Sequence, residues 1–425
     1  MRTNISVRQA SAPPPRGVRP AVLAVLGIIS LACVGLVVIH LARSRALPTA
    51  DDPSSPGLKA QRQSAAARAP SMAHHVAAGP FSSRIEVTPE LRDLIYRLAD
   101  PMLARRGLTE DEAAAWKSDL QRLIDEGDFA VAAIHEFLAK NMDVTFGPNG
   151  NALLGYSSAR MALIDALAQV GSPLAEMALA DVLKHTADPM EIAQVGRDLE
   201  KLEPGVYRAD VIDAVRQTLA MAAGGNLPGI DVGPLFQTLR QFGGADTVGD
   251  LEAATTQWSY YAAMALAQLP GDAGLASLVR NVSGADGPAA RTAALQALVE
   301  LASQSVDARN ALIEQVRQGK LSSYDWATLV QFLAGNQMVF QNSAFDNALV
   351  AVNSNDLRKT MIAMGNQSFY IAPLSALTPA QIDRQRALID QLLGVTTDPA
   401  AVQVLHQAKA SLDRRSTLLA GSSVP

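Results

Sequence analysis

Three similar stretches of the sequence decide the fold: RMALIDALAQVG at Arg160–Gly171, YAAMALAQLPG at Tyr261–Gly271 and RTAALQALVEL at Arg291–Leu301. Each stretch is rich in small residues and places its leucines on one side of a helix. After the first two, a turn containing glycine leads into a second apolar helix, at Leu174–Leu183 and at Leu275–Val279. The second and third stretches align with an offset of 29 residues. The pattern predicts helix pairs that recur along the chain and stack on one another.

These pairs resemble HEAT repeats, the helix-pair repeats that stack into α-solenoids. The resemblance is clearest over 151–305 and extends by continuity across 85–417. Short HEAT-like repeats carry Asp and Arg at set positions. Arg160 and Arg291 stand near the starts of their helices, whereas Tyr261 replaces the arginine between them. The resemblance implies a scaffold that binds other proteins, and it identifies no partner.

The region 85–417 carries signals of helix starts rather than of strands. Period-2 alternation is nearly absent, and a capping residue followed by proline or by a capping box recurs. These starts are Thr88-Pro89, Thr109 with Glu112, Thr378-Pro379 with Gln381, and Asp398-Pro399. The amide-rich residues 336–368 are interpreted as connections between helices, with contacts to a polypeptide or glycan as the alternative. We therefore predict an all-α fold of stacked antiparallel helix pairs over 85–417, followed by a disordered tail at 418–425.

The apolar run Ala21–Ala42 precedes this domain and would span about 33 Å as a helix, enough to cross a bilayer once. A secretory signal has a shorter apolar region, and a lipoprotein would turn polar after Cys33, where this segment stays apolar. We predict an uncleaved transmembrane helix, with cleavage or lipidation as the alternatives. In this interpretation residues 1–20 are a short basic cytoplasmic tail, and 43–84, rich in Ala, Ser and Pro, are a flexible linker.

The orientation of the transmembrane helix is less strongly encoded. Four arginines precede the run and four basic residues follow it within 43–62, so Lys and Arg counts alone give a tie. The free amino terminus adds charge to the first side, and long domains translocate largely regardless of their own charge. We predict a single-pass protein of the inner (cytoplasmic) membrane with its large C-terminal domain in the periplasm. A domain that faces the cytoplasm is the alternative.

Charge is distributed unevenly along the chain. Ten basic and two acidic residues lie in 1–84, which leaves 26 basic and 39 acidic residues for 85–425. We expect no nucleic-acid partner, because phosphate contacts need cations and this domain is acidic. The single cysteine, Cys33, lies in the apolar run. Disulfides and thiolate metal sites are therefore excluded within 85–425.

The sequence shows no motif of a catalytic, cofactor or metal site. HExxH, GxSxG, Walker-type and GxGxxG patterns are absent, and the His135-Glu136 pair is followed by Ala139 where a zinc-protease helix needs its second histidine. We predict a membrane-anchored, non-enzymatic scaffold that mediates protein–protein interaction in the bacterial cell envelope, with no cofactor. The alternative is an envelope enzyme that acts on peptidoglycan or glycan through a carboxylate acid/base pair, because carboxylates are plentiful.

Aromatic residues near the starts of two repeat helices are the candidate partner-binding residues: Trp258, Tyr260, Tyr261, Tyr324 and Trp326. Aromatics are enriched at interfaces, although core packing also explains them. Two insertions rich in Gly and Pro, 143–157 and 222–250, interrupt the helices, and long loops often carry binding. In the second, Phe236, Leu239 and Phe242 lie at helical spacing, which predicts a short helix that packs back onto the core.

Overall fold

The computed structural model describes residues 86–106, 108–284, 286–342, 345, 360–373 and 378–421. The predicted cytoplasmic tail, transmembrane helix and linker all lie outside these residues. Among the helices in the described ranges, none combines the length and the apolar character needed to cross a bilayer.

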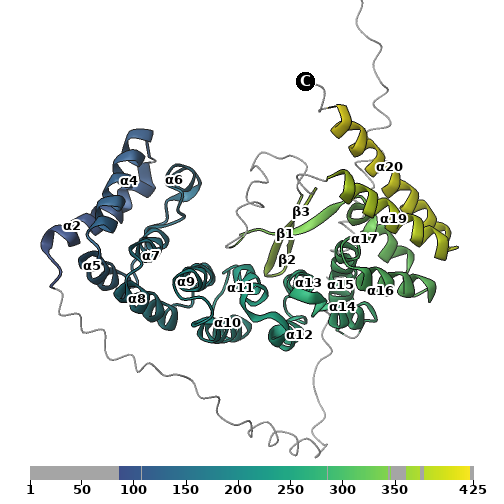
Figure 1. Ribbon diagram of the computed structural model, residues 1–425, viewed down its shortest axis with the longest axis horizontal. Coiled ribbons are helices and arrows are strands. Elements are labelled where there is room, and N and C mark those ends of the chain that lie inside the picture. Colours follow the sequence, from purple (N-terminus) through teal and green to yellow (C-terminus); the bar gives the residue numbers. More distant parts are fainter. Residues whose placement is uncertain are drawn as a thin grey trace, which may run out of the picture. The chain divides into compact units, whose positions relative to one another are not determined.

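The described chain is predominantly α-helical (Figure 1). Its first helices are α2 (Pro89–Leu98), α3 (Pro101–Arg106), α4 (Glu110–Asp125), α5 (Asp128–Leu138), α6 (Gly147–Leu154), α7 (Ala159–Val170), α8 (Pro173–His185), α9 (Pro189–Leu202) and α10 (Arg208–Ala223). The middle elements are α11 (Gly233–Gly243), η1 (Gly244–Thr247), α12 (Val248–Ala254), α13 (Ser259–Ala267), η2 (Pro270–Asp272), α14 (Leu275–Val282) and α15 (Pro288–Ala302). The last helices are α16 (Val306–Arg317), α17 (Ser323–Leu333), α19 (Pro379–Val395) and α20 (Pro399–Gly421).

The predicted capping signals start helices as expected. The Thr88 hydroxyl accepts a hydrogen bond from the Leu91 amide at the start of α2, which satisfies one of the unpaired donors of the first turn. Thr109 with Glu112 opens α4 through a complete capping box, and Thr378 with Gln381 opens α19 in the same way. At the other end of the domain, α20 continues to Gly421, so residues 418–421 of the predicted tail are helical.

Successive helices pack in the way that a helical repeat requires. The series α5, α7, α9, α11, α13, α15 and α17 forms one layer, in which each helix contacts the next. Some of the helices between them contact both neighbours in this layer, as α8 does with α7 and α9, and α14 does with α13 and α15. Helix α13 is buried along almost its whole length, because it lies between two neighbours of its own layer. This packing is compatible with an α-helical repeat.

Close approach between helices depends on small residues. The backbone of Gly274, just before α14, lies against Leu266 of α13, and a Cβ atom on Gly274 would stand 2.2 Å from the Leu266 carbonyl oxygen. A real Cβ cannot occupy that position, so any side chain at residue 274 would push the two helices apart.

Both predicted insertions contain helix. Residues 143–157 include α6 and are tied to the start of α7, because the Asp143 carboxylate accepts hydrogen bonds from the amides of Val144 and Arg160. Residues 222–250 include α11, where Phe236 and Leu239 are fully buried, as the spacing predicted.

A small sheet corrects the all-α prediction. Strands β1 (Asn336–Phe340), β2 (Thr360–Met364) and β3 (Gln367–Pro373) form an antiparallel sheet in the order β1-β3-β2. The segment predicted as helix connections therefore contains all of β1 and β2 and the start of β3. Buried and partly buried residues alternate over the first half of β3. The strands are only five to seven residues long, so each presents too little apolar alternation to be recognised from the sequence.

Strand β3 supplies the missing cap of α13. The Gln367 side-chain oxygen accepts hydrogen bonds from the amides of Tyr260 and Tyr261, at 2.9 and 3.1 Å. These amides belong to the first turn of α13, whose N-cap residue, Trp258, makes no side-chain cap. A strand more than a hundred residues later in the chain therefore satisfies donors that the helix cannot satisfy itself.

Candidate functional site

Four of the five predicted aromatic site residues are buried. Trp258, Tyr260, Tyr261 and Trp326 are at most 6 % exposed, whereas Tyr324 is 56 % exposed. Tyr260 stacks on Phe369 of β3 with ring centroids 4.7 Å apart. Trp258 and Tyr261 contact Phe236 of α11, and Tyr260 contacts the sheet, so these three side chains pack α13 against its neighbours. In this structure only Tyr324 of the five offers a surface to a partner.

Tyr261, which stands where its counterparts carry arginine, also makes polar contacts. Its hydroxyl donates to the Asp231 carboxylate at 2.7 Å and accepts from the Ser368 amide at 2.8 Å. Burial, followed by the charge of Asp231, raises the pKa of Tyr261, so the hydroxyl stays protonated. Tyr261 thus links α13, the segment before α11 and strand β3.

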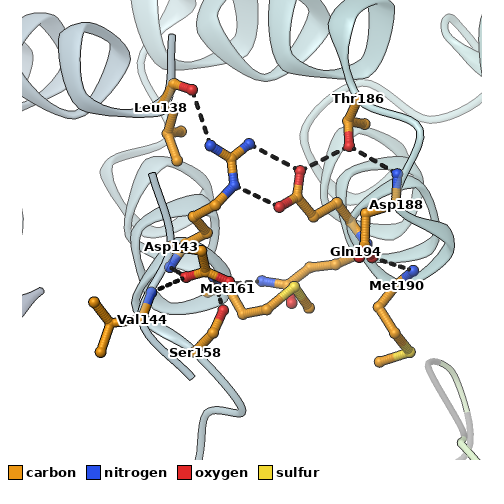
Figure 2. Close-up of polar contacts among 11 residues, drawn as sticks. Leu138, Asp143, Val144, Ser158, Met161, Thr186, Asp188, Met190 and Gln194 are labelled. Carbon is orange, nitrogen blue, oxygen red and sulfur yellow. Dashed lines mark hydrogen bonds and ion pairs between the residues drawn. The ribbon is translucent and has the colours of Figure 1, made fainter. Parts of the chain in front are cut away.

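A buried ion pair occupies the first arginine position. Arg160 of α7 donates to Glu191 of α9 from Nε at 2.6 Å and from Nη2 at 3.0 Å, and both side chains are less than a tenth exposed. The other guanidinium nitrogen donates to the Leu138 carbonyl, and the Thr186 hydroxyl donates to Glu191, as Figure 2 shows. Burial lowers the pKa of Arg160, but the hydrogen bonds and charge of Glu191 outweigh it and leave that pKa raised. Because these groups satisfy one another, we interpret the cluster as structural.

The second arginine position repeats this arrangement. Arg291 of α15 donates to Asp325 of α17 at 2.9 Å and to the carbonyl oxygens of Val282 and Lys320. As with Arg160, the carboxylate lies on the next helix of the same layer. The two arginines therefore fasten neighbouring helices of one layer, and their hydrogen bonds are made within the protein.

A polar cavity of about 640 Å³ is the candidate site. It lies where α13, α15, α16, α17, β1 and α19 converge. Its uncharged polar lining comes chiefly from side-chain amides: Gln268, Gln304, Asn336, Gln337 and Gln385. Amides offer both donors and acceptors, so such a lining suits a ligand that also carries both, as a polypeptide backbone does. Phe332 is the one aromatic residue among the described lining residues; it is 1 % exposed and gives no platform on which a sugar ring could stack.

Glu300 is the distinctive group of this cavity. It lies near the end of α15, is half-buried, and its Oε1 accepts a hydrogen bond of 2.7 Å from the Met338 amide of β1. Burial raises the pKa of Glu300 to about 8, and the Met338 hydrogen bond only partly opposes this. Glu300 makes no ion pair with any residue that the structure describes. Its carboxyl therefore lacks a counter-charge.

The two other carboxylates of the cavity have a structural explanation. Asp272 accepts a hydrogen bond from the hydroxyl of Ser305, the N-cap residue of α16. Asp307 lies in the first turn of the same helix. Both negative charges therefore compensate the positive end of the helix dipole. Arg240, the cation of this lining, donates to the Gln268 side chain.

The sequence did not reveal this cavity, because its lining comes from residues 240 to 385 and no local pattern unites them. One signal was present: Glu300 is the single acidic residue of α15, a helix made mostly of Ala, Leu and Val. Within the described residues, no group of three or more His, Cys, Asp or Glu side chains is placed to hold a metal ion.

Comparison with known proteins does not assign this chain to a family. No protein-family model matches the chain, and no similar sequence was found among the curated proteins.

Proposed function

We propose that this chain is a HEAT-like α-helical repeat scaffold, held at the bacterial inner membrane by Ala21–Ala42, whose domain binds a polypeptide partner in the periplasm without catalysis. The observation that carries the proposal is the amide-lined cavity beside β1. Helical repeat proteins commonly use their stacked surfaces for binding, which is an analogy of fold. The cavity adds a feature specific to this chain, since its donors and acceptors match those of a peptide backbone.

Photo-crosslinking in cells tests the proposal at the two ends of one helix. Gln304 lines the cavity just before α16, and Gln318 follows the far end of the same helix; both side chains are exposed. Each residue is replaced in turn by p-benzoylphenylalanine in the full-length, membrane-inserted chain. We expect a discrete adduct with another protein from residue 304 and not from residue 318.

Equal adducts at both positions, or none at residue 304, would contradict binding at the cavity. Matched expression of the two variants, checked by immunoblot, serves as the control. A reporter fused to the C-terminus and active only in the periplasm tests the orientation, and an inactive reporter would place the domain in the cytoplasm.

One observation favours the enzymatic alternative. The raised pKa of Glu300 would keep a proton available at neutral pH, as a general acid requires, and Asp272 and Asp307 line the same cavity. The test is incubation of the full chain with purified peptidoglycan. Release of soluble fragments that the Glu300→Gln variant no longer produces would replace the scaffold proposal by the enzyme. Among the described residues that line the cavity, none offers an exposed aromatic ring for a sugar to stack on, which favours the scaffold.

A further inference from the structure

We propose that the cavity receives a lysine or arginine side chain of the polypeptide partner, with the Glu300 carboxylate as its counter-ion. This inference rests on the proposed function and specifies which chemical feature of the partner is recognised. Its structural basis is the position of Glu300 beside β1, in a cavity large enough for such a side chain.

The charge distribution around the cavity selects a cation. Asp272 and Asp307 already compensate the start of α16, and Arg240 is hydrogen-bonded to Gln268. Glu300 lies on α15 with one hydrogen bond, from an uncharged amide, and no ion pair to a described residue. A half-buried carboxylate without a counter-charge is costly, so an incoming ammonium or guanidinium group gains more there than at a solvated acid.

The surroundings suit the rest of such a side chain. Val306, at the first position of α16, lines the cavity and is 63 % exposed, so it can contact the methylene stem of a lysine or arginine. The exposed Gln304 and the partly exposed Gln337 can hydrogen-bond to the partner's main chain next to that side chain. A neutral ligand would use the same amides but would leave Glu300 without a counter-charge.

Binding of a cation must be coupled to loss of the Glu300 proton. The free carboxyl has a pKa of about 8, so at neutral pH it is mostly protonated and has to release a proton to solvent before it can pair with the ligand. The affinity therefore rises with pH up to about 8 and then levels off. The other charged groups that line the cavity are Arg240, Asp272 and Asp307, and Arg415 of α20 bonds to Asn336 at β1.

The test uses three fluorescent peptides, acetyl-Ala-Ala-X-Ala-Ala-amide with X as lysine, arginine or glutamine, and the full chain in detergent micelles. Fluorescence anisotropy gives the affinity at pH 6.5 and pH 8.5, where lysine and arginine are both charged. We expect the lysine and arginine peptides to bind at least about tenfold tighter than the glutamine peptide at pH 8.5. We also expect their affinity to fall about 20-fold at pH 6.5, because Glu300 is then protonated.

Variants assign the effect to one carboxyl. Glu300→Gln should remove both the preference and the pH dependence, while Glu300→Asp, which keeps the charge, should retain both in weaker form. Glu314→Gln is the matched control, because Glu314 lies near the other end of α16 and pairs with Arg317. Equal binding of all three peptides, no binding of the cationic peptides, or a preference that survives Glu300→Gln would overturn the inference. If residue 304 still crosslinks to a partner in those cases, the proposed function stands and only the cationic recognition falls.

Discussion

Replacing Arg160 by methionine should cost far more stability than replacing an exposed arginine. The change leaves the Glu191 carboxylate buried, with the Thr186 hydroxyl as its remaining side-chain donor, and it also removes the donor to the Leu138 carbonyl. Breaking one side of a buried pair typically costs about 3–5 kcal/mol, because the remaining charge stays out of water. Arg92, paired with Glu136 at the surface with 45 % of its side chain exposed, is the matched control, and its loss should cost far less, because water screens an exposed pair and solvates the carboxylate that remains.

The double variant Arg160→Met/Glu191→Met makes the prediction sharper. Removing both charges eliminates the uncompensated carboxylate, so most of the lost stability should return. Amide hydrogen exchange in the full chain, of α7 and α9 for Arg160→Met and of α2 and α5 for Arg92→Met, measures the local free energy of opening, which does not require all the helices to unfold in one step. If Arg160→Met and Arg92→Met cost the same, or if the double variant is less stable than Arg160→Met, the reasoning about the buried charge is wrong.

Three further predictions concern other parts of the domain. Tyr261→Phe removes the hydroxyl between Asp231 and Ser368 and should cost about 1–3 kcal/mol, measured by urea unfolding; an unchanged midpoint would contradict this role. Glu300→Gln should raise the melting temperature above that of the natural chain at pH 9, whereas the two melting temperatures should be similar at pH 5. The reason is that a carboxyl with a raised pKa destabilises the folded state increasingly as pH rises toward about 8. A difference in melting temperature that does not change with pH would argue against burial of the charge. Gly274→Ala should destabilise the chain by about 1–3 kcal/mol, whereas Gly249→Ala, in open space on α12, should stabilise it by up to about 1 kcal/mol. Thermal melts in which both variants shift the melting temperature in the same direction would refute the packing argument.

Local sequence signals predicted the helices well, because their causes are local. Thr109 and Glu112 lie three residues apart and satisfy each other's backbone whatever surrounds them. The arginines at 160 and 291 were recognised as related positions, although their carboxylate partners could not be chosen from sequence, since each lies more than 30 residues away.

The sheet and the cavity escaped prediction because their causes are distant. Gln367 looks like one more amide in a polar segment until β3 brings it to the start of α13. Glu300 looks like an ordinary helix residue until Met338 and the cavity surround it. Four predicted aromatic site residues are buried because α13 and α17 are interior helices of the stack, and periodicity alone does not distinguish an interior face from a concave surface.

The contact of Gln367 with α13 also affects how the domain unfolds. In a stack where each repeat contacts only its neighbours, the end can fray one unit at a time. Here a bond between residues 106 positions apart ties the middle of the stack to a strand that follows α17. Release of β3 exposes unpaired amides at α13, so fraying from the C-terminal side meets an added barrier in the centre of the array. The region from α13 to β3 should therefore open as one cooperative unit, while α2 to α10, in which helices contact mainly their near neighbours in the chain, should open gradually.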